Sequence, residues 1–518
     1  MAQTHLTRRT FLQAGISAAA LIATPGLMAK MVPYRGDRTF QPDVELELRT
    51  VTDQVSILPG HKTQVQRYRA RLLKGPASTL TELPDVYLGP SLNFQQGQKV
   101  RIILRNQLTE PHITHWHGLH VPQRSDGHPM YTLPAGGHYV YEFEVLNRAG
   151  TSFYHAHTHE RTAEQVYHGL AGLITVTDAD EHALALPSGP FEMPLVLQDR
   201  SFDANNQLRY LGHGMHDKMQ GFLGDTVLVN GRPDAQFHMQ SRAYRLRVLN
   251  GSNARIYKLA LEDSTPLTAI GTDAGLLSQP EQRPYLVIAP GERIDLWLDL
   301  SGRELGDTLR LLSLPVPGVL PGMMGGGRGR MGGHGMDRHA GTEATITLAQ
   351  FTVTERVTDS PSLPQHLVTI PKLTATDAAP IDLSLQMRPM SPSINGRSFS
   401  MTDIAQEEQV ALGSMRRIRL INNASGMGPA RMMAMAHPMH FHGQQFQVIS
   451  RNTDAVRGDY ASLKDGFLDG GWKDTVLVLP GETVEIIKPF EDFQGKFLFH
   501  CHNLEHEDLG MMRQFDVV

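Results

Sequence analysis

Histidines are concentrated in four short clusters of this 518-residue chain. The clusters read HWHG, HAHTHE, HPMHFHG and FHCHNLEHEDLGMM, and their candidate metal-binding side chains are His115, His117, His155, His157, His437, His440, His442, His500, Cys501, His502, His506 and Met511. Neutral imidazole is a common ligand for copper and zinc. Residues two apart in a β-strand face the same side, so an extended His-x-His pair presents two imidazoles to one volume. The spacing therefore predicts metal sites built on strands.

The last cluster contains the only cysteine of the chain, Cys501, between His500 and His502. On a strand Cys501 points away from the face that its two neighbours share, so one tripeptide reaches into two sites. One Cys, two His and a distant Met make up the blue-copper electron-transfer set, whereas a structural zinc site more often uses several cysteines. The residues that fit the blue-copper set are His437, Cys501, His506 and Met511. The alternative is an inert buried thiol beside unrelated histidines.

The segments that must position these side chains are predicted strands. KVRIILRNQL (99–108) and HYVYEFEV (138–145) alternate apolar and polar residues and are rich in β-branched or aromatic types. Three patterns recur in the same order further along the chain: VLVNGRP and SINGRS, RLRVLNGS and RIRLINNAS, VIAPGERIDL and LVLPGETVEI. Repeats at this distance indicate duplicated domains. We expect an all-β fold of Greek-key β-sandwich domains.

The repeats predict the domain boundaries. We place the domains at residues 44–180, 190–353 and 381–518, with a Pro/Thr/Ser-rich linker at 354–380. The histidine clusters lie in the first and third domains. The middle domain has no such cluster, and its histidines His213, His216 and His238 are predicted to be loop or surface residues. We expect this domain to be a structural spacer that shapes the substrate side.

The first 29 residues are predicted to be a targeting segment. Arg8 and Arg9 precede Phe-Leu and a short apolar run, which is typical of a twin-arginine signal peptide. We therefore expect export in the folded state, through the twin-arginine machinery, to the periplasm. Retention of the segment as an anchor is the alternative.

The composition limits the partners of the protein. A formal net charge of −5 and a pI of about 6.6 give no reason to expect nucleic acid or an anionic membrane as a partner. The single cysteine excludes an intrachain disulfide. We expect a monomer.

With its four motifs together, the chain resembles the multicopper oxidases. The resemblance implies three cupredoxin domains, four copper ions, and four one-electron oxidations of substrate coupled to reduction of O2 to water. Carried over by position, the type 1 copper ligands are His437, Cys501, His506 and Met511. The type 2 ligands are His115 and His440, and the type 3 pair takes His117, His155, His157, His442, His500 and His502. His159 lies outside the pattern and is expected at the surface or behind a ligand.

Two acidic residues are candidate proton donors for water formation. Asp126 follows HWHG at the place where related enzymes hold an acid beside the trinuclear site. Glu507 follows the ligand His506 directly. The alternative is that each is an ordinary turn or solvated acid.

Methionines give the only indication of the substrate. The glycine-rich segment 321–339 contains Met323, Met324, Met331 and Met336, and Met433 and Met435 precede the ligand His437. Thioethers favour Cu(I), and the pattern resembles the periplasmic cuprous oxidases, so these residues are candidate substrate-copper ligands. Met also fills cores, and the loop can be inert. A phenol- or bilirubin-oxidising laccase is the alternative, and a copper-free cell-division scaffold of the same fold is a lesser one.

Overall fold

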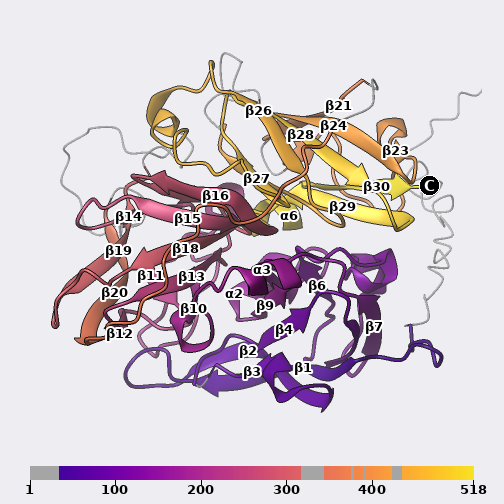
Figure 1. Cartoon of the computed structure of the whole chain (residues 1–518). Helices are drawn as coiled ribbons and strands as arrows, with labels where there is room; N and C mark the ends of the chain where they lie inside the picture. The colour runs from indigo at the N-terminus through magenta and orange to yellow at the C-terminus, as the bar shows by residue number, and fades with distance from the viewer. Residues whose placement is uncertain (1–33, 84, 317–343, 375–378, 389–390, 423–433) are drawn as a thin grey trace, which may run out of the picture. The chain divides into compact units, whose positions relative to one another are not determined.

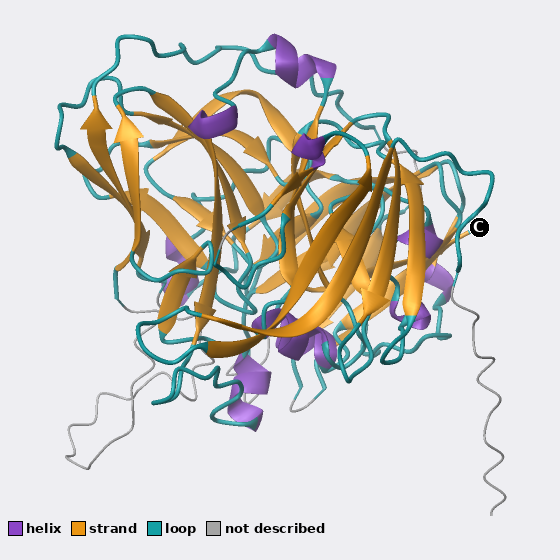
Figure 2. Ribbon diagram, turned by 90° about the horizontal axis from the view of Figure 1, so that it is seen from below, coloured by secondary structure: helices purple, strands orange, loops and turns teal. Residues whose placement is uncertain are grey.

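Alternating burial along the strands produces the sheets of this fold. The computed structural model describes residues 34–83, 85–316, 344–374, 379–388, 391–422 and 434–518. β5 (Lys99–Asn106) buries Val100, Ile102 and Leu104, while the residues between them are more exposed. Together with β7 (His138–Glu144), it confirms the first two predicted strands. Figure 2 shows that strands dominate and that the helices are short, so the all-β prediction is confirmed.

The first domain contains a four-stranded sheet, β2-β1-β5-β7, and a five-stranded sheet, β3-β4-β9-β8-β6 (Figure 1). The second sheet carries the first two histidine clusters at the ends of β6 and β8. The remaining strands of this domain are β1 (Val44–Val55), β2 (Thr63–Lys74), β3 (Leu80–Thr81), β4 (Ser91–Gln95), β6 (Thr114–His117), β8 (Gly150–Ala156) and β9 (Ala171–Thr177).

The second domain contains a six-stranded sheet, β11-β10-β13-β18-β15-β16, and a five-stranded sheet, β12-β20-β19-β14-β17. Its strands are β10 (Glu192–Arg200), β11 (Thr226–Val229), β12 (Ala235–Gln240), β13 (Ala243–Asn250), β14 (Tyr257–Leu261), β15 (Leu267–Thr272), β16 (Gly275–Arg283), β17 (Leu286–Ile288), β18 (Arg293–Asp299), β19 (Thr308–Leu314) and β20 (Ile346–Glu355). Strand β20 therefore includes the first two residues of the predicted linker. Further along that segment, Leu367 packs into the core of this domain.

The third domain contains the sheets β22-β21-β24-β28-β26 and β23-β30-β29-β25-β27. Its strands are β21 (Ile381–Gln386), β22 (Ser393–Ile394), β23 (Gln409–Val410), β24 (Ser414–Ile421), β25 (His437–Phe441), β26 (Gln447–Asn452), β27 (Thr475–Val478), β28 (Thr483–Phe490), β29 (Gly495–Cys501) and β30 (Met512–Val517). Cys501 and Met511 belong to the apolar core of this domain.

The same strand pairing recurs in each domain, as the sequence repeats predict. The first strand of each domain pairs in parallel with a later one, as β1 with β5, β10 with β13 and β21 with β24. A second parallel pair, β4 with β9, β12 with β20 and β23 with β30, also recurs. Recurrence of both pairs in chain order is the arrangement expected of a duplicated sandwich.

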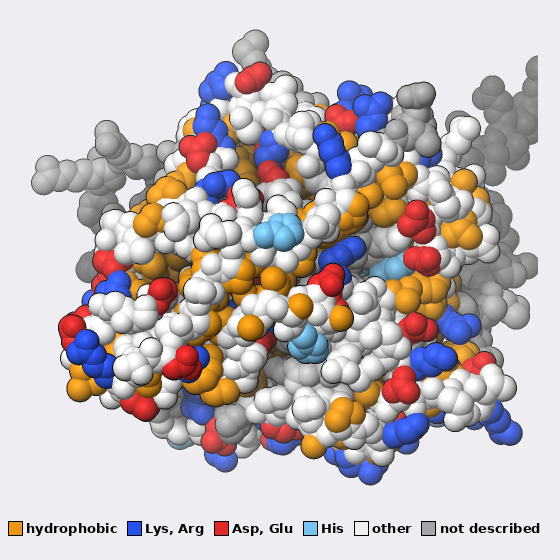
Figure 3. Space-filling model, in the orientation of Figure 1, with side chains coloured by type: hydrophobic (Ala, Val, Ile, Leu, Met, Phe, Trp, Pro, Cys, Tyr) orange, Lys and Arg blue, Asp and Glu red, His pale blue; other side chains and the backbone are white. Residues whose placement is uncertain are grey.

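The helices are brief connections between strands. They are α2 (Thr162–Tyr167), α3 (Ala179–Ala183), α4 (Met215–Gln220), α6 (Leu504–Asp508) and the 3₁₀ turns η1 (Ala77–Thr79), η2 (Gln123–Ser125), η3 (Pro129–Tyr131), η4 (Gly189–Phe191), η5 (Gln406–Glu408) and η6 (Gly458–Ser462). Among the described residues, none of these helices has the length and apolar character needed to cross a bilayer. On the face drawn in Figure 3, Lys/Arg and Asp/Glu side chains are interspersed.

Candidate metal centres

Two pairs of antiparallel strands position the eight histidines predicted to hold the trinuclear cluster. In the first domain β6 pairs with β8 so that His115 lies opposite His155. In the third domain β25 pairs with β29 so that His440 lies opposite His500. Each His-x-His pair thereby presents its imidazoles on one face. All eight side chains are buried, and they are His115, His117, His155, His157, His440, His442, His500 and His502.

Imidazole nitrogens from the two domains converge. His115 Nε2 lies 3.4 Å from His440 Nε2, which unites the two predicted type 2 ligands. His500 Nε2 lies 3.2 Å from His442 Nε2 and 3.4 Å from His157 Nε2. A metal–imidazole bond is about 2 Å long, so nitrogens at these separations can share an ion. The first and third domains therefore each supply part of the site.

The other three predicted type 3 ligands form a second group. The rings of His117 and His155 lie 4.9 and 5.4 Å from that of His502. Within the described part of the chain, His117 Nδ1, His155 Nε2 and both ring nitrogens of His502 are buried without a hydrogen-bond partner. Leaving buried polar atoms unpaired costs about 1–3 kcal/mol each, which a bound metal ion offsets. The geometry thus fits metal ions: the nitrogens of His157, His442 and His500 form one close group, and His117, His155 and His502 are the three predicted type 3 ligands that remain.

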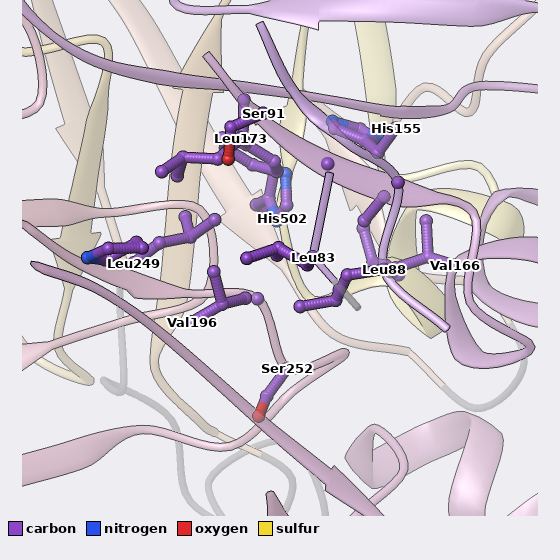
Figure 4. Close-up of a pocket in the computed structure, with 17 residues that line it drawn as sticks. Leu83, Leu88, Ser91, His155, Val166, Leu173, Val196, Leu249, Ser252 and His502 are labelled. Atoms are coloured by element: carbon purple, nitrogen blue, oxygen red, sulfur yellow. The ribbon is translucent and has the colours of Figure 1, made fainter. Parts of the chain in front are cut away.

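An apolar pocket reaches the back of this second group. His155 and His502 line it together with Leu83, Val196 and Leu249, which come from the first two domains (Figure 4). Apolar walls exclude water from this side of the two imidazoles and lower the local dielectric.

Three of the four predicted type 1 ligands, His437, Cys501 and His506, come together inside the third domain. Cys501 Sγ lies 3.4 Å from His437 Nδ1 and 3.7 Å from His506 Nδ1. Met511 is fully buried; its amide donates to the His506 carbonyl at 2.9 Å, and its own carbonyl accepts from the Cys501 amide at 3.0 Å. These two main-chain bonds close the loop that carries three of the four residues.

Burial prepares these groups for a metal. It lowers the pKa of His440 to about 3 and that of His506 to about 4, so both imidazoles are neutral and able to bind metal near neutral pH. Burial also raises the pKa of the Cys501 thiol, so this thiol keeps its proton until a metal ion displaces it.

Asp126 lies between ligands of different predicted types. Its Oδ2 accepts a hydrogen bond from His442 Nδ1 at 2.7 Å, and its main-chain carbonyl accepts from His115 Nδ1 at 2.6 Å. Gly127 follows with φ +84°, and a Cβ there would lie 2.1 Å from the Thr114 carbonyl, so the turn requires glycine. The tight turn holds the Asp126 carboxylate against the cluster.

Glu507 is the second predicted acid, and it is buried beside the group formed by His157, His442 and His500, which we call the 157/442/500 group; His117, His155 and His502 are the 117/155/502 group. The carboxylate oxygens of Glu507 lie 3.1 Å from His500 Nδ1 and 3.8 Å from His157 Nε2. Neither Asp126 nor Glu507 is therefore a solvated surface acid, and both are buried beside histidines of the predicted cluster.

Sequence reasoning missed Asp474 and Arg293. Asp474 accepts from His117 Nε2 at 3.0 Å, and Arg293 of the second domain forms a bidentate pair with its carboxylate. The second domain therefore does more than the structural spacer predicted from the sequence, since its Arg293 pairs with a residue that contacts a predicted ligand. A detectable signal was present: charged residues stand directly before the apolar strands in KDTVLV and GERIDL.

A segment of the second domain, residues 210–222, covers the predicted type 1 ligand His506; we call it the strap. His506 Nε2 donates to the Met219 carbonyl at 3.1 Å. Glu505 accepts from Tyr210 Oη at 2.9 Å and from the Phe222 amide at 3.0 Å, which fastens both ends of the strap. The strap therefore lies between His506 and solvent.

The predicted substrate-copper residues are placed unevenly. Met323, Met324, Met331, Met336 and Met433 lie outside the described residues. Met435 is 2% exposed, so its thioether is part of the interior rather than the surface. His159 is one-third exposed and packs against the ring of Phe399.

The chain forms three cupredoxin sandwiches that hold a buried Cys/His/Met site and, next to it, a buried site of eight histidines. These features define the class of copper oxidases. Family models described as multicopper oxidase match residues 64–181 and 373–518. The McoA multicopper oxidase of Aquifex aeolicus has a similar structure, with a TM-score of 0.75, 32% identity, and coverage of 92% of this chain and 97% of that one. The chain belongs to the multicopper oxidase family, and it is an oxidoreductase.

Three relatives show how varied the similar proteins are. The multicopper oxidase mco of Staphylococcus aureus is 29% identical, covering 91% of this chain and 92% of the relative. The bilirubin oxidase of Albifimbria verrucaria is 30% identical, covering 83% of this chain and 71% of the relative. The cell division protein FtsP of Proteus mirabilis is also 30% identical, over 83% of each chain.

Proposed function

We propose that the electron donor of this oxidase is Cu(I), with small phenols as slower donors, and that O2 is the acceptor. The observation that carries the proposal is the strap, which contacts the predicted type 1 ligand His506 through the Met219 carbonyl and carries the exposed side chains of His213 and Met215. The fold and the family support an oxidase with any of these donors. The donor itself is inferred from the chemistry of the strap.

The donor sets described above fit four copper ions. One ion would be held by His437, Cys501, His506 and Met511, one by His115 and His440, and two by the 157/442/500 and 117/155/502 groups. Copper bound there supplies one-electron oxidation of substrate and reduction of O2 to water. Because His500, Cys501 and His502 are consecutive, the main chain itself joins the two kinds of site by a few covalent bonds.

The strap decides what approaches His506. The Met219 carbonyl occupies the Nε2 edge of this imidazole, so an organic substrate cannot contact that edge while the strap is in place. On the outer side, Met215 is 49% exposed and the His213 side chain is 52% exposed. His213 Nδ1 lies 3.5 Å from Asp217 Oδ1, a separation that one small ion can bridge. Thioether and imidazole are ligands that suit Cu(I).

The two buried acids would deliver protons for water formation. Asp126 Oδ1 is buried with no hydrogen-bond partner among the described residues, which leaves this oxygen able to carry a proton toward the cluster. Glu507 Oε2 lies 3.1 Å from His500 Nδ1 on the other side. Each acid therefore serves a different edge of the site.

The test compares oxygen uptake with Cu(I) and with a phenol. Met215→Ala and His213→Ala should each lower Cu(I)-dependent uptake and leave phenol-dependent uptake unchanged. Leu305→Ala is the matched control, since Leu305 is an exposed apolar residue (64%) outside the strap. Equal rates in all variants with Cu(I) would remove the strap as a donor site, and a faster rate with phenol in the intact chain would favour a laccase.

Spectroscopy distinguishes an oxidase from a copper-free cell-division scaffold. This distinction is needed because the cell division protein FtsP is also 30% identical to this chain. The complete set of twelve donor residues supports an oxidase instead. Copper-loaded protein should show the intense visible absorption of thiolate-bound copper, and a chain without this absorption after loading is not an oxidase.

We further propose that the chain is exported to the periplasm by the twin-arginine route and acts as a monomer. The support is the Arg8-Arg9 motif with its apolar run, in residues outside the described part of the chain. Replacing both arginines with lysine should retain the protein in the cytoplasm, as fractionation measures. Analytical ultracentrifugation at two protein concentrations tests the monomeric state, and the sedimentation coefficient should be the same at both.

A further inference from the structure

A turn of the second domain is inserted against the histidines of the other two. The turn between β17 and β18 and the first residue of β18 have the sequence APGER, residues 289–293. Gly291 has φ +85°, and a Cβ there would lie 3.0 Å from the His502 ring and 3.1 Å from the His117 ring. Only glycine combines this conformation with so close an approach. The turn therefore forms a wall of the 117/155/502 group.

Arg293 ends this turn and is fully buried. A guanidinium has five N–H donors. Two of them go to Asp474, at 2.7 and 2.5 Å, and three go to the main-chain carbonyls of Thr151, Gly291 and Asp273, at 2.9, 2.8 and 2.7 Å. Every donor is used, and the acceptors come from all three domains. The position of this guanidinium is therefore fixed.

Asp474 transmits this position to two ligands. Its Oδ1 accepts from His117 Nε2 at 3.0 Å, and its main-chain carbonyl accepts from His440 Nδ1 at 2.9 Å. A carboxylate only accepts, so the proton of His117 stays on Nε2 and Nδ1 keeps its lone pair. That Nδ1 is one of the buried nitrogens without a partner among the described residues.

We propose that Arg293 is a positioning residue of the trinuclear site, which acts through Asp474 to fix the tautomer and orientation of His117. The second domain thus supplies part of the machinery for O2 reduction. Lysine is not an equivalent replacement, because an ammonium lacks the planar fork that binds a carboxylate through two parallel bonds. The inference rests on the copper sites proposed above.

The test measures copper retention against a chelator in Arg293→Lys. Loss of a partner behind a metal ligand typically weakens metal binding about 10–100-fold. We expect a loss of that size for trinuclear copper, a changed electron paramagnetic resonance spectrum of type 2 copper, and unchanged visible absorption from the Cys501 site. Arg245→Lys is the matched control, since Arg245 is a buried arginine of the same domain paired with Asp295. It should lower thermal stability without a selective loss of copper.

The outcomes distinguish this inference from the function on which it rests. If the natural chain binds no copper, the proposed function fails first. If the natural chain binds four ions and Arg293→Lys retains them as well as Arg245→Lys does, the positioning role is wrong. Should Arg293→Lys not fold, Asp474→Asn tests the same step: it keeps the shape of the side chain and weakens the pair with Arg293, and selective trinuclear copper loss is again expected. Full retention in that variant overturns the inference.

Discussion

The strap offers the sharpest test of how substrate reaches the type 1 site. Tyr210→Phe removes the hydroxyl that donates to Glu505 at 2.9 Å and keeps the ring, which packs against Tyr167 and Phe222 at 4.8 and 5.5 Å between centroids. The change therefore loosens one end of the strap without removing its apolar contacts.

The magnitude follows from the type of bond that is lost. A hydrogen bond to a charged group contributes about 1.5–3 kcal/mol, and we take the lower value because Tyr210 is half-buried. About 1.5 kcal/mol corresponds to roughly a tenfold increase in the population with the strap open. If phenols reach His506 only through that population, kcat/KM for a phenol should rise by up to about tenfold. The value for Cu(I), which uses the closed strap, should not rise.

Steady-state oxygen uptake with both donors measures this, with thermal unfolding recorded in parallel. Tyr131→Phe is the control, because it deletes a hydroxyl of similar geometry that donates to Gln123 at 2.9 Å in the first domain. A phenol rate that does not change in Tyr210→Phe, despite a measurable loss of stability, refutes the reasoning that the strap restricts access.

Three further predictions concern Asp126, the buried His112 and the segment 321–339. Asp126→Asn should slow O2 reduction and leave the visible absorption of the Cys501 site intact, as rapid mixing with O2 measures. Burial lowers the pKa of His112 to about 4 from the usual 6.5, so its contribution to stability is present above pH 6.5 and is lost toward pH 4. Between pH 7 and 4.5, metal-free His112→Asn should lose about 2.5 kcal/mol less unfolding free energy than the metal-free natural chain, as urea titration measures. Deleting residues 321–339 should lower oxygen uptake with Cu(I) more than with a phenol; an equal effect on both indicates an inert loop.

The strands and the donor residues were the predictable part of the molecule. Period-two burial in β5 and β7 depends on local sequence, so the strands at 99–108 and 138–145 were recognisable within a residue or two. The opposite orientation of Cys501 and its flanking histidines follows from the same period. Strand geometry alone therefore separates the two kinds of site.

The contacts behind the ligands were not predictable, because they depend on how the domains dock. The pair formed by Arg293 and Asp474 joins residues 181 positions apart, and no periodic pattern relates them. The strap has no strand or long-helix pattern, and its place over His506 follows from the bonds that its residues make with Glu505, His506 and Asn503. Charged residues before an apolar strand can be noticed in the sequence, but nothing local shows which residue of another domain each of them will contact.

The distance along the chain between contacting groups also affects how the protein folds. His442 and Asp126 are 316 positions apart, and His440 and His115 are 325 apart. Closing loops of that length has an entropic cost before any contact compensates for it, and folding slows as contacts become less local. The trinuclear site should therefore be completed late, after each sandwich has folded separately. During refolding, early copper uptake should reflect only the Cys501 site, whose residues span a single domain.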